Sequence, residues 1–352
     1  MGCPNMCSFC DQKAISGETK PPLPSDIADE CRESLEKYDL SGCEIAFFGG
    51  SFTAIPRENM VAYLEAVQPF LGEKGFSGIR ISTRPDALPY ETLDILKKYG
   101  VTAIELGAQS MSDKVLQMNR RGHSAEDIIK ASERIKEYGF SLGLQAMYGL
   151  YGSTAEDEEY TLSQCIKLRP DTMRIYPVVV LEGTHLGELY KSGEYILPSW
   201  DDMTEFVSYA ICRLKDENIS LIRCGLHAEK SMEERILGGF YHPALKEMVL
   251  QRLYLKKMLL WAEKYSELLK NRTKGSTVTA EVKKGDAGLV TGHNKSNRLM
   301  FSEKAFGTGL RIVENSEYSR GILRLCLENK DRTETLGEEV YDVFKITGIT
   351  RL

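Results

Sequence analysis

The chain has 352 residues, of which 42% are hydrophobic and 27% charged, a composition typical of a globular protein with a large core and two or three domains. Its net charge of -6 excludes a global basic field for nucleic acid but still allows a local basic patch. No apolar run approaches the roughly 18 residues of a membrane helix, and the N-terminus lacks the pattern of a secretory signal. We therefore expect a cytoplasmic protein with no membrane partner.

The nine cysteines are too scattered, and odd in number, for a disulfide framework. Only Cys3, Cys7 and Cys10 form a group, with the spacing C-x3-C-x2-C. We expect most of the others to be small buried hydrophobic side chains.

Three thiolates on so short a loop can converge on one metal centre. A 4Fe-4S cluster normally takes four thiolates, so three leave one iron open for the amino and carboxylate groups of S-adenosylmethionine (SAM). A structural zinc ion would need a fourth ligand, which His123 could supply only through a tertiary contact.

Helices and strands alternate between about residues 25 and 184. The predicted helices are 25–38, 57–71, 89–99, 124–138 and 154–168, and the predicted strands are 44–48, 78–83, 102–107, 140–147 and 172–180. This order predicts a parallel sheet covered by helices, either a partial or full barrel or an open doubly wound sheet. In each case ligands bind at the carboxyl ends of the strands.

The rhythm changes after about residue 195. We expect long helices at 199–216 and 243–271 and a β-rich tail at 276–328. The segment 270–298 is basic and polar, which is compatible with phosphate contacts. The predicted domains are a core (1–195), a helical extension (196–270) and a small β-rich tail domain (271–352).

Several strand ends carry residues suited to a ligand. Gly49 and Gly50 let the backbone approach a ligand closely and leave carbonyls for an ammonium group. Arg84 could clamp a carboxylate or could pair with Asp86. Arg174 is a charge within an apolar strand, so it needs a partner and could face the cofactor.

Further candidates follow the same logic. Thr83 or Gln109 could bond a ribose, and the glycine-bearing strand end that starts at Met147 could receive an adenine edge. Phe9 could stack on that adenine or simply pack. Three others are weaker candidates, for an anion site or for radical relay: His123, Tyr176 and Tyr241.

The cysteine loop, residues 2–12, resembles that of the radical SAM superfamily. Further stretches are similar to the radical SAM half of the elongator catalytic subunit family, over roughly residues 1–245. They are residues 47–53, 81–86, 105–110, 119–123, 173–177 and 239–243. This resemblance implies a partial (β/α)6 barrel with an α+β C-terminal extension.

The resemblance also implies an enzyme that reductively cleaves SAM at a 4Fe-4S cluster held by Cys3, Cys7 and Cys10 to make a 5′-deoxyadenosyl radical. Taken together with the strand-end positions, the residues that we expect to bind SAM are Phe9, Gly49, Gly50, Ser51, Thr83, Arg84, Gln109, Met147 and Arg174. The methionyl amine would lie at Gly49–Gly50. An external one-electron donor such as flavodoxin or ferredoxin is implied, with tRNA modification as the purpose.

The chain departs from this family in two ways. It starts two residues before Cys3, so we expect a barrel that lacks its first strand. The tail is too short for the acetyltransferase domain of the elongator-type enzymes, so a reaction with acetyl-CoA does not carry over.

Two other functions stay open. An oxygen-independent coproporphyrinogen oxidase-like oxidoreductase shares the cysteine loop and a similar barrel. A non-catalytic metal-binding scaffold for nucleic acid would keep the metal without cleaving SAM.

Overall fold

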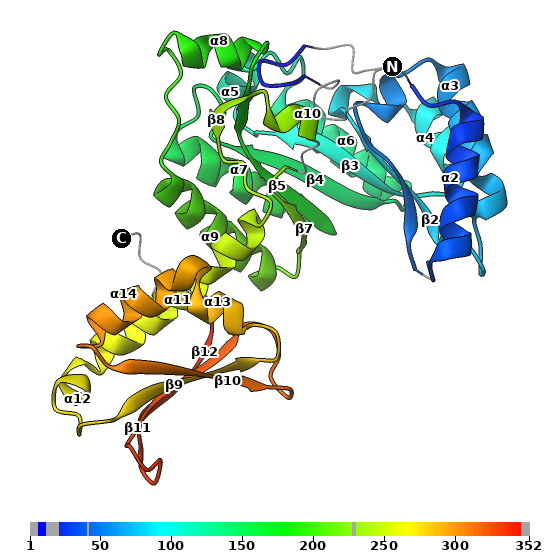
Figure 1. Ribbon diagram of the computed structural model, residues 1–352. Helices are drawn as coiled ribbons and strands as arrows, with labels where there is room; N and C mark the ends of the chain where they lie inside the picture. The colour runs from blue at the N-terminus through cyan, green and yellow to red at the C-terminus, as the bar shows by residue number, and fades with distance from the viewer. Residues whose placement is uncertain (1–5, 12–20, 41, 227–229, 346–352) are drawn as a thin grey trace. The chain divides into compact units, whose positions relative to one another are not determined.

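The structure, a computed structural model, describes residues 6–11, 21–40, 42–226 and 230–345. The chain divides into two compact units, and it passes between them three times (Figure 1). Unit 1 comprises Met1–Pro198 and Ile219–Pro243, and unit 2 comprises Ser199–Asn218 and Ala244–Leu352. No described helix is both long enough and apolar enough to cross a bilayer.

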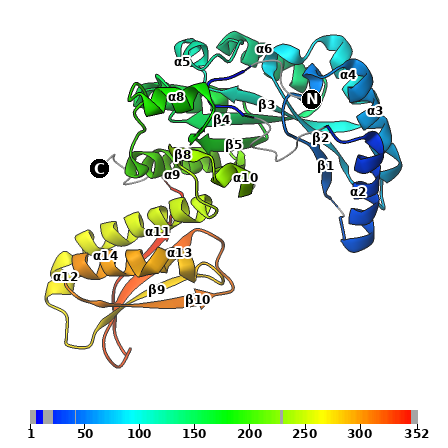
Figure 2. The same cartoon turned by 45° about the horizontal axis from the view of Figure 1, so that its top comes forward.

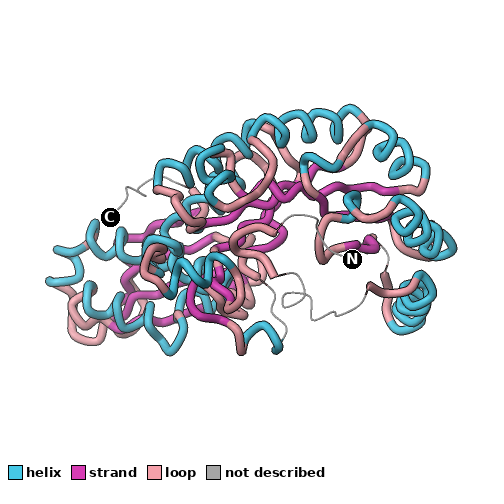
Figure 3. The backbone as a smooth tube through the Cα atoms, turned by 90° about the horizontal axis from the view of Figure 1, so that it is seen from above, coloured by secondary structure: helices cyan, strands magenta, loops and turns pink. Residues whose placement is uncertain are grey.

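Unit 1 is built on a six-stranded sheet in which all neighbouring strands are parallel, in the order β1-β2-β3-β4-β5-β7. Its strands are β1 (Glu44–Phe47), β2 (Gly78–Thr83), β3 (Val101–Gln109), β4 (Ser141–Tyr148), β5 (Thr172–Pro177) and β7 (Ser220–Cys224). The sheet curls into an open half-barrel with β1 and β7 at its edges (Figure 3). The predicted partial barrel is therefore confirmed, and the first described strand follows the cysteine loop.

The helices of unit 1 are α2 (Pro24–Lys37), α3 (Arg57–Val67), α4 (Tyr90–Lys98), α5 (Asp113–Met118), α6 (Ala125–Glu137), α7 (Ala155–Lys167), α8 (His185–Lys191) and α10 (Lys230–Glu233). Of these, α4, α6 and α7 cover the outer face of the sheet at β3 and β4 (Figure 2). The start of α6 is fixed by a capping box, in which Ser124 and Asp127 satisfy each other's backbone N–H groups. Thr154 and Asp157 do the same for α7.

Strand residues alternate between the two faces of the sheet, and β4 shows the pattern. Leu142, Leu144 and Ala146 are buried, while Gln145 and Met147 are half-buried. The buried set packs beneath the covering helices, since α6 and α7 both contact β4. The half-buried set faces the inside of the half-barrel, where a ligand would enter.

The predicted strand 172–180 is two strands. β5 ends at Pro177, and β6 (Val179–Leu181) pairs instead with β8 (Ile236–Gly239) as an antiparallel ribbon. The prediction of one strand was wrong because its apolar run continues through the point where the chain changes partner. Pro177 has no N–H to continue the ladder, and Gly239, with a φ of +99°, leaves room for the Val178 carbonyl, which would lie 2.4 Å from an added Cβ.

Unit 2 places helices on a four-stranded sheet of order β10-β9-β11-β12. The strands are β9 (Thr277–Lys283), β10 (Gly309–Asn315), β11 (Ile322–Glu328) and β12 (Thr335–Asp342), with β9 and β10 parallel and the other pairs antiparallel. The helices are α9 (Trp200–Asp216), α11 (Leu245–Lys264), α12 (Ser266–Lys270), α13 (Ala287–Thr291) and α14 (Ser296–Lys304). Buried Trp261 joins α11 to the sheet, because its indole N–H donates to the Gly337 carbonyl over 2.7 Å.

These units cross the domain boundaries predicted from the sequence. Helices α9 and α11, from the predicted helical extension 196–270, belong with the β-rich tail, while β7 and β8 return to unit 1. The tail itself contains α13 and α14 between its strands β9 and β10. A crossover helix is what two neighbouring parallel strands require.

Candidate functional site

Two of the three grouped cysteines are described. Cys7 is 6% exposed, Cys10 is half-buried, and the Cys10 N–H donates to the Cys7 carbonyl over 3.2 Å. Cys3 lies outside the described residues, and among those described no three His, Cys, Asp or Glu side chains gather as metal ligands would. The turn brings Cys7 and Cys10 together in the described part of the cysteine loop, residues 6–11.

The cysteine loop is anchored through Ser8. The Ser8 hydroxyl donates to Asn119 Oδ1 over 2.7 Å and its N–H to the Asn119 carbonyl over 3.1 Å. Its carbonyl accepts from the Leu186 N–H at the start of α8 over 2.7 Å, and Figure 1 shows the dark-blue loop beside α8. At the end of the loop Asp11 pairs with Arg235 over 2.7 Å. The described part of the loop is thus held at Ser8 and at Asp11.

Arg121 contacts the metal-ligand candidate directly. Its Nη1 donates to Cys7 Sγ over 3.1 Å, its Nη2 donates to the Gly107 carbonyl on β3 over 2.6 Å, and its guanidinium lies 5.9 Å from the centre of the Phe9 ring. The arginine is 6% exposed. The buried guanidinium therefore places a positive charge and an N–H donor on the Cys7 sulfur.

This donor set fits an iron–sulfur cluster. Cys7 and Cys10 are presented by one turn, and the cation beside Cys7 offsets negative charge on its sulfur. The ligand spacing leaves one iron without a protein thiolate, as a cluster that binds SAM requires.

The ends of β1 and β2 meet in a cluster of hydroxyl groups. Thr83 Oγ1 lies 2.8 Å from Ser51 Oγ and 2.6 Å from Thr53 Oγ1, and both Ser51 and Thr83 are buried. Gly49 and Gly50, just before them, have φ values of +105° and +146°, a backbone region that glycine adopts without strain. The structure therefore brings these four predicted residues to one edge of the sheet.

Arg84 is 4% exposed and forms the ion pair that was its alternative role. Its Nε and Nη2 each donate to Asp86 over 2.8 Å, and Nη2 also donates to the Arg121 carbonyl over 2.8 Å. The carboxylate of Asp86 already occupies this guanidinium. Binding of the SAM carboxylate by Arg84 stays a prediction.

Gln109 and His123 lie close to the two arginines. Gln109 has a φ of +66°, and its buried Oε1 has no hydrogen-bond partner among the described residues. Such an orphan acceptor at a strand end is suited to a ligand hydroxyl. Burial, and then the charges of Arg121 and Arg84, lower the pKa of His123 to about 4. The imidazole is therefore neutral at pH 7.

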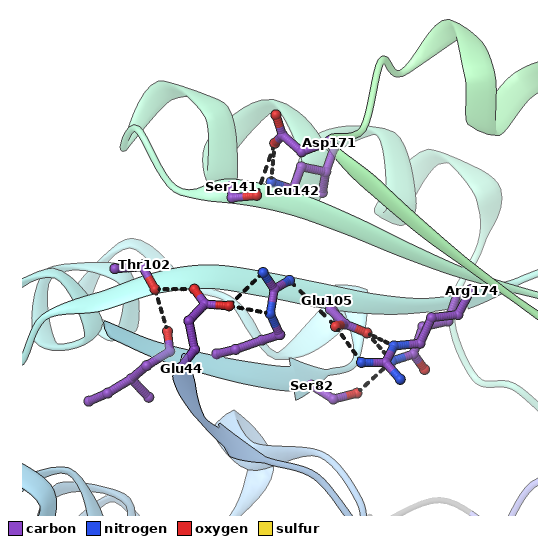
Figure 4. A network of polar contacts seen from close by, with 11 residues as sticks. Glu44, Ser82, Thr102, Glu105, Ser141, Leu142, Asp171 and Arg174 are labelled. Atoms are coloured by element: carbon purple, nitrogen blue, oxygen red, sulfur yellow. Dashed lines mark hydrogen bonds and ion pairs between the residues drawn. The ribbon is translucent and has the colours of Figure 1, made fainter. Parts of the chain in front are cut away.

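Arg174 faces the inside of the half-barrel, but its partner is Glu105 on β3. The Arg174 Nε and Nη2 atoms donate to the two Glu105 oxygens over 2.5 and 2.9 Å (Figure 4). Gln145 Nε2 also donates to Glu105, over 2.9 Å, and the Phe48 ring lies 4.8 Å from the Arg174 guanidinium. Met147 is half-buried two residues beyond Gln145 on the same face. The predicted contacts of Arg174 and Met147 with SAM stay predictions.

Sequence reasoning missed three residues of this site. Glu105, a charge in the apolar strand β3, carried the same signal that singled out Arg174. Asn119 and Arg121 lie in the stretch 119–123 that carries the family resemblance, but their contacts with Ser8 and Cys7 were not predicted, because these partners are more than a hundred positions away.

Two family models match consecutive parts of the chain. The model of the radical SAM superfamily matches residues 1–165, and that of the radical SAM C-terminal domain matches residues 170–255. The chain belongs to the radical SAM superfamily. The first match contains the cysteine loop and β1 to β4, and the second begins just before β5.

Relatives of this radical SAM chain include a tRNA uridine(34) acetyltransferase of Methanocaldococcus infernus, 36% identical over 200 residues, which cover 51% of this chain and 38% of that protein. The heme chaperone HemW of Bacillus subtilis is 24% identical over 238 residues, or 66% of this chain and 63% of that protein. The chain thus spans less than two thirds of each. A solved structure, the archaeal M. infernus Elp3 with an N-terminal deletion, shares the fold at 23% identity and a TM-score of 0.54, covering 89% of this chain and 72% of that one.

Proposed function

We propose that this protein is an enzyme that reductively cleaves SAM at a 4Fe-4S cluster held by Cys3, Cys7 and Cys10. The observation that carries the proposal is the buried guanidinium of Arg121 on the Cys7 sulfur, in a loop fixed at the carboxyl ends of the strands. When bound, the cluster supplies the electron that breaks the sulfonium C–S bond of SAM and releases a 5′-deoxyadenosyl radical.

The chain's own residues would bind and orient SAM. The carbonyls at Gly49 and Gly50 would accept from the methionyl ammonium, and the hydroxyls of Ser51 and Thr83 would bond its polar groups. Gln109 Oε1, which lacks a partner among the described residues, would accept from a ribose hydroxyl. Phe9 would cover one face of the adenine.

The test uses anaerobically purified protein reconstituted with iron and sulfide, then mixed with dithionite and SAM. We expect about four irons per chain and formation of 5′-deoxyadenosine, measured by chromatography. The Cys7→Ala variant should lose both, whereas Cys165→Ala, which removes a buried thiol of α7, should keep both. Zinc in place of iron, or turnover that persists without Cys7, would refute the proposal.

We further propose tRNA as the substrate. The proposal is supported by the name of the archaeal relative and by exposed lysines of the basic segment 270–298, among them Lys274, Lys283 and Lys284. Phosphate contacts make binding weaken as salt rises. We expect tRNA affinity, measured by fluorescence anisotropy, to fall steeply with salt, and to fall further in Lys283→Glu/Lys284→Glu. Affinity that is independent of salt and of these lysines would exclude this surface.

A tetrapyrrole substrate is the second candidate, supported by the likeness to a heme chaperone. Competition separates the two. If an added porphyrinogen or haem changes the rate of SAM cleavage while added tRNA has no effect, a tetrapyrrole is the substrate class.

A further inference from the structure

The structure places the side chain of Arg121 on the sulfur of Cys7, one of the proposed cluster ligands. It lies in the link between α5 and α6, residues 119–124, far from Cys7 in sequence. Its Nη1 donates to Cys7 Sγ over 3.1 Å, while Nη2 is occupied by the Gly107 carbonyl at 2.6 Å. The two ends of the guanidinium fork therefore bridge the cysteine loop and β3.

The position of Arg121 is fixed before any ligand binds. Its N–H donates to the Leu116 carbonyl at the end of α5 over 3.0 Å, and its carbonyl accepts from Arg84 Nη2 over 2.8 Å. Gly107 makes room for the fork, because a Cβ there would lie 3.3 Å from Arg121 Nη2. A side chain held at both its backbone and its tip keeps its charge at one place relative to the sulfur.

We infer that Arg121 raises the reduction potential of the cluster by donating its hydrogen bond to the Cys7 sulfur; this inference rests on the proposed function. Reduction adds one electron, taken from the external donor, and part of its charge is spread onto the thiolate sulfurs. An N–H donor and a fixed positive charge stabilise that more negative state over the oxidised one. At 6% exposure the interaction is only weakly screened by water.

The adjacent Arg120 provides a matched control. It is exposed, and its Nη2 lies 2.9 Å from His185 Nε2 instead of at a sulfur. Its replacement removes the same charge one position away and leaves the bond to Cys7 in place. A difference between the two variants therefore separates the buried guanidinium bonded to the sulfur from a solvent-screened charge at the next position.

The experiment is a potentiometric titration of the reconstituted full chain without SAM, followed by the electron paramagnetic resonance signal of the reduced cluster. We expect Arg121→Gln to shift the midpoint potential to more negative values than wild type, and Arg120→Gln to shift it much less. Arg121→Lys, which keeps the charge but cannot bridge both partners, should fall between wild type and Arg121→Gln. Iron content and circular dichroism establish that each variant is folded and loaded.

The outcomes separate the two proposals. A wild-type chain that takes up no redox-active cluster refutes the proposed function. A loaded Arg121→Gln protein with the wild-type potential refutes the role of Arg121 and leaves the proposed function standing. If Arg121→Gln does not take up iron, the Arg121→Lys variant provides the test. A midpoint potential more negative than wild type supports the role of Arg121, and a midpoint potential equal to wild type overturns it.

Discussion

Glu158 shows how a single buried carboxyl organises the edge of the site. Its Oε1 accepts from the Gly149 N–H and from the Ser153 hydroxyl, each over 2.8 Å, and so holds the loop that follows β4. Burial raises the pKa of Glu158 from 4.5 to about 7, against the opposing effect of these two hydrogen bonds. Between these pH values the folded chain binds a proton that the unfolded chain releases.

The free energy of unfolding should therefore fall as pH rises from about 4.5 to about 7, by about 3 kcal/mol from this group alone. Above about pH 7 this contribution is lost. In Glu158→Gln this decrease in the free energy of unfolding should be absent. Urea titrations of wild type and variant between about pH 4.5 and 7 measure the difference. The matched control is Glu159→Gln, at the exposed next position of α7. Parallel pH profiles for wild type and Glu158→Gln would contradict the prediction.

For single residues, the sequence predicts which side chains belong to the site better than it predicts which partners they contact. Strand-end position alone brought Ser51 and Thr83 to one place, because the carboxyl ends of neighbouring parallel strands always meet. The contact between Arg121 and Cys7 depends on how a loop docks on a link 114 positions later in the chain. No local spacing predicts such a contact.

The inner face of the sheet carries a network of charges that links four strands. Arg80 on β2 bonds Glu44 on β1 over 2.7 Å, and Glu105 on β3 pairs with Arg174 on β5 and lies 3.5 Å from Arg80 (Figure 4). Glu105 is 1% exposed. Its negative charge is shared by two arginines on the concave face.

Removal of that charge should destabilise the half-barrel. Glu105→Gln would leave Arg174 without its bidentate partner, which costs about 3 kcal/mol for a buried pair. The double variant Glu105→Leu/Arg174→Met should recover most of the loss, because no charge is then left unpaired. Urea denaturation measures both. An equal loss in the single and double variants would show that packing, and not charge pairing, dominates here.

Asn119 joins three elements at the cysteine loop. Its amide donates to the Val115 carbonyl of α5 over 2.8 Å and to the Tyr151 carbonyl after β4 over 2.9 Å, while its Oδ1 accepts from Ser8. Asn119→Ala should cost about 2 kcal/mol of unfolding free energy, because buried carbonyls lose their donors. It should also reduce the iron bound per chain on reconstitution.

A graded variant tests this interpretation. Ser8→Ala removes only the Ser8 hydroxyl and leaves both amide donations of Asn119 in place. Its loss of unfolding free energy and of bound iron should therefore be smaller than that of Asn119→Ala. Iron analysis and urea titration of both variants make the comparison. A Ser8→Ala loss as large as that of Asn119→Ala would place the whole effect in the cysteine loop.

Helices and strands were predicted correctly where the hydrophobic pattern of the sequence is long, and they were missed where it is short. Helices such as α6 and α7 carry full caps and several apolar turns, so the sequence indicates them directly. Helices α5 and α8 have six and seven residues, too few for a clear period. β7 is five residues with an arginine, and only its pairing with β5 makes it the last strand of the sheet.

At the scale of the whole molecule, the chain cannot be divided at one peptide bond. It leaves unit 1 after Pro198, returns at Ile219 and leaves again after Pro243. Composition and rhythm suggested a break near residue 195, since long helices begin there. The sequence does not reveal the return, because β7 and β8 are short.

A chain that ends at Pro198 should therefore misassemble. β5 would lose β7 and β6 would lose β8, which exposes two strands with unpaired backbone groups. We expect size-exclusion chromatography to show aggregates for residues 1–198 and a discrete peak for the full chain. A monodisperse, folded 1–198 protein would show that β7 and β8 are dispensable to unit 1.

During translation, the same interleaving fixes an order of events. Helix α9 leaves the ribosome before β7, yet α11, against which it packs, is made only after β7 and β8. The apolar side of α9, with Met203, Val207 and Ile211, must therefore stay uncovered on the nascent chain while the half-barrel completes its sheet. A ribosome-associated chaperone would find its binding segment there, for the time needed to synthesise about thirty further residues.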